Sequence, residues 1–337
     1  MRWMTAVPAL ALSLLVGCTS QVSNDYPAPP DGRGRTFSEP RASVQTALSD
    51  GPGITALINK NYNENTTSCT EYGTGKTRGY YFCTGVLLRT TDDGNFNPWE
   101  SSSLAAQLQA TSYSWIRHDL TTTQFYKPAG FIVLSPADVL GSAVPGITYP
   151  THTGLTNTMV KCVYPFDAWT TRVMSRNYFG CNFEGTGLGS PDVYNSWGSC
   201  DNRLGYRTSA QRDAYFRSAG QVNYAQCSWN ADSQYGWANM IASHNGFAGQ
   251  AGWNEVMLHN GGPTSAGIAN LNEKTRRWIV AFFYDAQKAN GLTIAQSFQR
   301  KMAATNKSVP ILRLSFTAPA AQRFEYRQAD QVVGLYP

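Results

Sequence analysis

The sequence predicts an α+β protein with a β-rich core of mostly antiparallel strands, a few short helices and long disulfide-tied loops. Three observations support this fold class. Apolar runs of strand length alternate with segments rich in Gly, Pro and Asn. Only 15% of the residues are charged, against about 25% in an average globular protein. Tyr (18), Phe (15) and Trp (9) are plentiful, a composition typical of β-rich exported proteins.

The N-terminus carries export signals. Arg2 precedes an apolar stretch over residues 3–16, which has the length of a signal-peptide core and is too short to span a membrane. The stretch ends in the tetrapeptide LVGC, which resembles a bacterial lipobox and implies cleavage before Cys18 and acylation of that residue. An ordinary secretory signal with an incidental cysteine is the alternative. We expect a signal peptide over 1–17 and a flexible tether over 18–41.

The rest of the chain is expected to form two lobes. Residues 42–220 would make an N-terminal α+β lobe, and residues 221–337 a β-rich C-terminal lobe. Thr19 is not the aspartate that retains Gram-negative lipoproteins in the inner membrane, so we expect an outer-membrane lipoprotein or an extracellular protein. Contact with the membrane would be through the lipid anchor only.

The charge pattern does not indicate a nucleic-acid partner. The net charge is +5, but there is no long run of Lys or Arg, and doublets such as Arg276-Arg277 are isolated. A phosphate track needs many clustered cations. We expect a monomer.

The cysteines predict disulfides. Of the seven cysteines, six remain once Cys18 is assigned to the lipid, and an even number in an exported chain favours disulfides. We favour sequential pairing, in which each bridge closes a short loop: Cys69–Cys83, Cys162–Cys181 and Cys200–Cys227. Zinc is the alternative, but no pair has C-x2-C spacing and no histidine lies close to one, so we expect no metal.

The first core strand is expected at residues 80–88, which are rich in aromatic and branched side chains and are followed by a turn signal at 91–94. Arg89 would lie where this strand ends. A guanidinium there either pairs with a carboxylate at the rim of the protein or binds a phosphate or carboxylate at the mouth of a cleft.

The next strand shows a clear alternation. Ser112 and Ser114 alternate with Tyr113 and Trp115, so the aromatic rings should face the core while the serines share the other face with Ile116.

Later elements follow from the apolar pattern. Glu255 opens a short strand after a loop rich in Gly and Trp. Further strands are expected at 130–135, 278–284 and 310–316, and helices at 54–61, 101–110, 210–219 and 294–305.

Several enzyme classes lack their motifs. The chain has no H-E-x-x-H, no G-x-S-x-G and no P-loop, which argues against zinc proteases, Ser-His-Asp hydrolases and P-loop nucleotide enzymes. The four histidines are far apart in sequence. His244 stands out among them because it lies in the glycine-rich loop near Glu255.

The segments FCTGVLLRTT, SYSWIRHD, GFIVLSP, CVYPFDA, WNEVML, WIVAFFY and PILRLSF resemble the halovibrin-like family of secreted bacterial proteins, over most of residues 50–316. The part from WNEVML to PILRLSF is also similar to a domain of unknown function in other exported proteins. Halovibrins are described as ADP-ribosyltransferases, so the resemblance implies NAD as substrate and an acceptor of unknown identity.

The resemblance also implies roles for residues. LLRTT is similar to the arginine strand of mono-ADP-ribosyltransferases, SYS to a degenerate serine strand, and WNEVML to their E-x-E strand. Arg89 would hold the NAD phosphate, Ser112 or Ser114 would position the ribose and the catalytic Glu255, and Tyr113 or Trp253 would stack on nicotinamide. Thr208-Ser209 is a second candidate for the serine element.

One departure from the family pattern affects the expected reaction. Trp253 occupies the place of the first glutamate of E-x-E. This favours NAD hydrolysis, or an acceptor other than arginine. The alternative function is a non-catalytic cell-surface binding lipoprotein, whose aromatic side chains form a carbohydrate- or protein-contact surface. Without the resemblance, Glu255 can also be a solvated strand-edge carboxylate, the two serines a polar strand face and Trp253 a core anchor.

Overall fold

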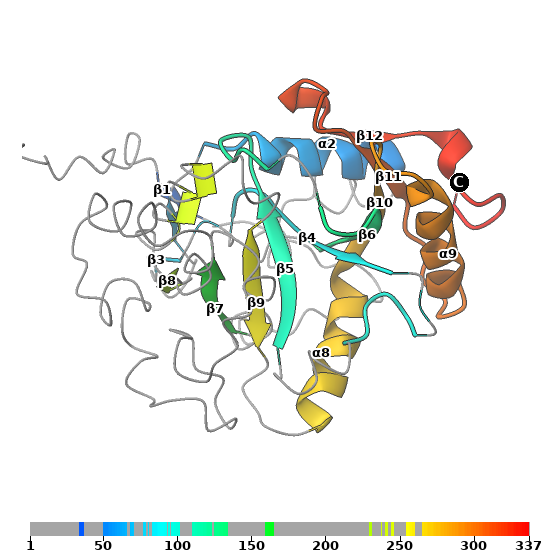
Figure 1. Cartoon of the computed structure of the whole chain (residues 1–337), viewed down its shortest axis with the longest axis horizontal. Coiled ribbons are helices and arrows are strands. Elements are labelled where there is room, and N and C mark those ends of the chain that lie inside the picture. The colour runs from blue at the N-terminus through cyan, green and yellow to red at the C-terminus, as the bar shows by residue number, and fades with distance from the viewer. Residues whose placement is uncertain are drawn as a thin grey trace, which may run out of the picture.

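A nine-stranded sheet forms the centre of the protein in the computed structural model (Figure 1). The structure describes residues 34–36, 50–65, 68–70, 77–78, 80, 83–92, 94, 96–101, 110–122, 125–133, 159–164, 229–230, 237, 240–241, 244–245, 254–259 and 265–336. The strand order is β12-β11-β10-β6-β4-β5-β9-β7-β8. Its strands are β4 (Val86–Thr91), β5 (Ala110–Ile116), β6 (Ala129–Val133), β7 (Met159–Tyr164), β8 (Trp229–Asn230), β9 (Glu255–His259), β10 (Ile279–Asp285), β11 (Ile311–Leu314) and β12 (Phe324–Tyr326).

The sheet is mostly antiparallel, as predicted. Only β10 and β11 run parallel within it. Strands from both sides of residue 220 are interleaved, because β6 pairs with β10 and β5 pairs with β9, so the two expected lobes share one sheet. A second sheet has the order β1-β2-β3, formed by β1 (Gly34–Thr36), β2 (Ser68–Thr70) and β3 (Thr77–Arg78). The β-rich α+β class is therefore correct.

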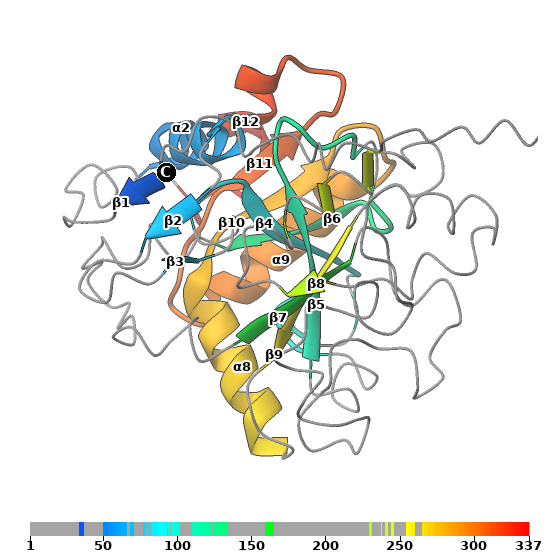
Figure 2. The same cartoon turned by 90° about the vertical axis from the view of Figure 1, so that its left-hand side faces the viewer.

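Helices cover both faces of the large sheet. They are α2 (Gly51–Tyr62), α8 (Ser265–Trp278) and α9 (Gly291–Ala303), with short 3-10 turns at η4 (Ala320–Gln322) and η5 (Gln328–Asp330). Figures 1 and 2 show α2 and α8 on opposite sides of strand β4. None of the described helices is both long and apolar enough to cross a membrane.

Two apolar clusters define the two faces. Leu87 of β4 packs in the cluster that includes Phe298 of α9, and we call this side the α9 face. Val86 and Leu88 pack in the cluster that includes Ile58 of α2, and we call this side the α2 face. The alternation along β4 follows from the two-residue period of a strand. Both faces are buried, which explains the continuous apolar runs in the sequence.

Helix α2 begins earlier than the predicted range of 54–61. The carboxylate of Asp50 accepts a hydrogen bond from Gly53 N at 2.5 Å and caps the helix. Pro52 is compatible with the first turn, where its missing N–H has no helical partner in any case. Helix α9 and strands β6, β10 and β11 overlap the predicted elements within a few residues.

Strand β4 differs from its prediction. Cys83 N and Thr84 N both donate to Tyr80 O, a pattern of a turn and not of a strand. Gly85 has φ +69, and a Cβ there would overlap the Trp115 ring. The strand therefore runs over 86–91, and Arg89 lies inside it and not at its end.

Helix α8 and strand β12 were not predicted. In α8, Glu273 pairs with Arg276 and Arg277 at 3.2 and 2.6 Å. Residues 102–109 and the predicted helix at 210–219 lie outside the described residues.

Candidate functional site

Three neighbouring strands carry the predicted site residues. Leu88 of β4 lies opposite Ser114 of β5, and Tyr113 lies opposite Val256 of β9. Continuing this register by one residue places Glu255 opposite Ser114, while Arg89 directly follows Leu88. Since neighbouring strands are about 4.8 Å apart, the backbones of the arginine, serine and glutamate positions span roughly 10 Å.

The pleat divides these residues between the two faces. Tyr113 and Trp115 pack in the cluster on the α9 face, whereas Ile116 packs on the α2 face. The predicted alternation of β5 is therefore confirmed, and Ser112 and Ser114 lie on the α2 face. Because Val256 belongs to the α9 face, Glu255 shares the face of the serines. Arg89 follows Leu87 by two residues and shares the face of Tyr113.

Arg89 lies where strand pairing changes. Strand β5 pairs with β4 through residues 114–116 and with β9 through residues 110–113. Beyond Leu88, β4 continues against β6 alone, with Arg89 opposite Phe131. The sheet thus divides between Arg89 and Tyr113.

Arg89 interacts electrostatically with residues on both faces of the sheet. Burial lowers the pKa of Arg89, while attraction by Tyr113 and by Glu255 opposes that shift. Among the described residues, Arg89 Nη1 is a buried nitrogen with no hydrogen-bond partner, although the side chain as a whole is half-buried. A buried donor without an acceptor is costly, so this atom is a candidate ligand contact.

Tyr113 is held by a helix. Its hydroxyl lies 3.2 Å from Thr275 Oγ1 of α8. Burial raises the pKa of Tyr113, and the nearby Arg89 opposes the rise. The ring is only 1% exposed and meets Phe131 edge-on at a centroid distance of 6.0 Å. The Tyr113 ring is thus held in a fixed position beside Arg89.

Glu255 lies on the other face, directly after a residue that is hydrogen-bonded to β5. Glu255 is 6% exposed. The preceding residue, Asn254, is fully buried and accepts a hydrogen bond from Ser114 Oγ at its main-chain oxygen, at 3.0 Å. The Asn254 side chain accepts from Trp115 N at 2.8 Å and donates to Trp115 O at 2.6 Å. The hydroxyl of Ser114 therefore holds the backbone that leads into Glu255.

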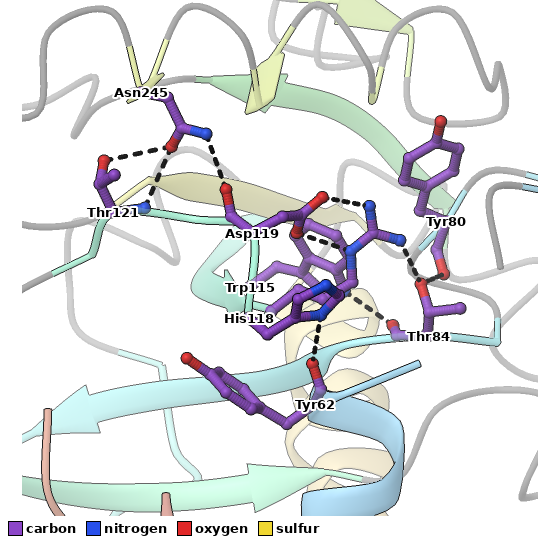
Figure 3. Close-up of polar contacts among 9 residues, drawn as sticks. Tyr62, Tyr80, Thr84, Trp115, His118, Asp119, Thr121 and Asn245 are labelled. Atoms are coloured by element: carbon purple, nitrogen blue, oxygen red, sulfur yellow. Dashed lines mark hydrogen bonds and ion pairs between the residues drawn. The ribbon is translucent and has the colours of Figure 1, made fainter. Parts of the chain in front are cut away.

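A second polar cluster lies beyond the end of β5 (Figure 3). Arg117 donates to both carboxylate oxygens of Asp119, at 2.8 and 2.6 Å. Its guanidinium carbon lies 4.8 Å from the centroid of the Tyr80 ring and 5.3 Å from that of Trp115. Trp115 Nε1 donates to Thr84 O at 2.9 Å. These contacts connect the end of β5 to the turn before β4 and stabilise the fold.

The histidines differ in their surroundings. His244 is fully buried, and its Nε2 lies 3.2 Å from Thr122 Oγ1. His118 is exposed, with Nδ1 3.2 Å from Tyr62 O (Figure 3). Within the described residues, no three side chains of His, Cys, Asp or Glu lie close enough together to hold a metal ion.

Several predicted residues cannot be placed. Cys83 is buried and disulfide-bonded, but the side chain of Cys69 on β2 and that of Cys162 on β7 are not described, so the pairing stays a prediction. The following lie outside the described residues: Cys18, His152, Cys181, Cys200, Thr208, Ser209, Cys227 and Trp253.

Sequence reasoning missed Asn254. Its partners are 139 residues away in the chain, so no local pattern could identify them. The only signal is its position directly before a glutamate that opens a strand.

Comparison of the chain with models of protein families gives no match, and comparison with curated proteins gives none either. The resemblance to halovibrin-like proteins and to ADP-ribosyltransferases therefore stays a prediction that rests on the segments quoted from the sequence.

Proposed function

We propose that this protein is an exported NAD-dependent ADP-ribosyltransferase or NAD glycohydrolase. The observation that carries the proposal is the strand order β4-β5-β9, which sets an arginine strand, a serine strand and a glutamate strand side by side. These are the three elements that the resemblance implies for NAD binding and cleavage.

The reaction breaks the bond between nicotinamide and ribose. Its electron pair leaves with nicotinamide, and an oxocarbenium-like charge develops on the ribose. The carboxylate of Glu255 would stabilise that charge, and its burial strengthens the effect because little water screens it. Water, or a nucleophilic group of the unknown acceptor, then bonds to the anomeric carbon and loses a proton. Hydrolysis yields ADP-ribose, nicotinamide and one proton from NAD and water.

Arg89 would bind the diphosphate. Its buried Nη1 has no partner among the described residues and would gain one from a phosphate oxygen. Planar guanidinium groups bind phosphate through paired, charge-assisted hydrogen bonds. Tyr113 is buried beside Arg89 on the face opposite Glu255, so it would support the guanidinium and not contact the nicotinamide end of the substrate.

The enzyme would be exported and would carry disulfide bonds. The lipobox-like LVGC favours a lipid-anchored or released protein, and the six remaining cysteines would tie long loops by disulfides. Cys83 already takes part in one disulfide.

Burial of the aromatic residues disfavours the alternative function. The tryptophans whose side chains are described are all buried: Trp99, Trp115, Trp237 and Trp278. Among the described residues, the exposed large apolar side chains are Phe96, Tyr126 and Val333. A carbohydrate-contact surface needs exposed rings, so the aromatic composition of this part of the chain serves the core.

The test is release of nicotinamide from NAD by the purified full-length protein. We expect release by the wild type and a loss of about 100-fold or more in Glu255→Gln, the scale of removing a group that stabilises transition-state charge. Glu273→Gln is the matched control, because Glu273 is an exposed helix carboxylate, and it should keep the wild-type rate. Absence of release, or equal rates in Glu255→Gln and wild type, would overturn the proposal.

A further inference from the structure

The side chain of Asn254 makes the hydrogen bonds to β5 that a main-chain peptide group of a paired strand would make. Its carboxamide exchanges two hydrogen bonds with the main chain of Trp115, and its own carbonyl accepts from Ser114 Oγ. A carboxamide has the donor and acceptor of a peptide group, so it can form the pair that two opposed strand residues form. We call this arrangement an amide clamp.

The clamp acts immediately before Glu255. Strand β9 begins at Glu255, so the clamp is the last contact with β5 before the carboxylate. Three hydrogen bonds to two residues of β5 fix the backbone of Asn254, and Asn254 is fully buried. Effective catalytic groups are held within about 0.5 Å of their working position by such supporting contacts.

We infer that Asn254 is a positioning residue for Glu255 in the NAD-cleaving site. The inference rests on the proposed function, and it assigns the clamp a task beyond folding. Asn254 does not itself contact the substrate in this account. It fixes the start of β9 so that the Glu255 carboxylate meets the charge that develops on the ribose.

A second amide clamp provides a control. Asn59 of α2 donates to Phe324 O at 2.8 Å and accepts from Phe324 N at 3.0 Å. Phe324 lies on β12, and the strand order separates β12 from β9 by five strands. Both make the same pair of main-chain bonds, but only one adjoins Glu255.

The experiment compares Asn254→Ala with Asn59→Ala in the full-length protein. Both should lower the midpoint of urea unfolding. We expect Asn254→Ala to lower kcat for nicotinamide release about tenfold or more, with KM for NAD within about twofold, since the loss concerns charge placement in the transition state. Asn59→Ala should keep the wild-type kcat. Ser114→Ala, which removes one bond of the clamp, should show a smaller fall in kcat and serves if Asn254→Ala does not fold.

Amide hydrogen exchange separates this inference from the proposed function. Trp115 N–H should exchange slowly in the wild type and faster in Asn254→Ala, whether or not NAD is cleaved. Inactive wild-type protein would overturn the proposed function, and the positioning role with it, even if the exchange result held. Active wild type with an unchanged kcat in Asn254→Ala and Ser114→Ala, or with unchanged exchange at Trp115, would overturn the inference alone.

Discussion

At the scale of residues, two arginines near β5 illustrate different roles. Arg117 has its guanidinium bound to Asp119 and set against the rings of Tyr80 and Trp115. Arg89 has a buried Nη1 without a partner among the described residues. Buried charges in a purely structural role are paired, because an unpaired one costs stability. The contrast favours a ligand-binding role for Arg89.

This contrast predicts different effects of the same substitution. Arg89→Met should lower the free energy of unfolding less than Arg117→Met does, because the unsatisfied Nη1 is removed although Glu255 loses an attracting cation, and should raise KM for NAD by about 10- to 100-fold. Arg117→Met should lower the free energy of unfolding by about 2 kcal/mol, since Asp119 loses its partner. Urea unfolding and steady-state kinetics measure both. A large loss of stability in Arg89→Met with unchanged KM would assign Arg89 to the fold.

At the scale of elements, side-chain amides form hydrogen bonds with the main chain of residues near the ends of strands. Besides Asn254 and Asn59, Gln331 accepts from Ile311 N at 2.8 Å and donates to Ile311 O at 2.9 Å. The Asn59 clamp also blocks the edge of β12, which would otherwise be open to pairing with another chain. Such contacts join residues distant in sequence, so none of them can be read from local pattern.

The end of β10 carries a second unsatisfied group. Asp285 is 1% exposed; its Oδ1 accepts from Gln287 N, and its Oδ2 is buried without a partner among the described residues. Burial raises the pKa of Asp285, although its hydrogen bond and Lys288 oppose the shift. The folded state therefore binds the proton more tightly than the unfolded chain does.

This shift predicts a pH-dependent stability. Asp285 contributes stability at pH values below the ordinary aspartate pKa of about 3.9, and that contribution is lost as the pH rises through the raised pKa of the folded state. The free energy of unfolding of the wild type, minus that of Asp285→Asn, should fall as pH rises above 4, by at most about 1.4 kcal/mol per pH unit. Urea unfolding from pH 4 to 7 measures it. A difference that stays constant or grows with pH would contradict the prediction.

At the scale of the whole molecule, the sequence predicts elements better than their arrangement. The strand at 110–116 was predictable from the alternation of serines with aromatic residues, and the strand at 279–285 from a continuous apolar run that is buried on both faces. Helix α8 was missed because its polar sequence, with a Glu–Arg pair at its surface, lacks a strong apolar run. Strand β4 was placed too early because Tyr80 has the composition of a strand residue but lies in a turn.

The candidate site shows the same limit. Arg89, Ser114 and Glu255 could be selected from their motifs, but their adjacency depends on β5 pairing with β4 at one end and with β9 at the other. Those pairings join residues far apart in the chain and depend on tertiary packing. The division of these residues between two faces, and the clamp at Asn254, are visible only in the folded protein.

The most direct test of the account is a crystal structure of Glu255→Gln with NAD bound, since that variant should bind the substrate without cleaving it. We predict one NAD molecule with its diphosphate on the guanidinium of Arg89 and its nicotinamide-bearing ribose within about 4 Å of the side chain at position 255, the range of a near-attack contact. NAD bound elsewhere, or contacting only one of these two positions, would contradict the claim that β4, β5 and β9 form a single NAD-cleaving site.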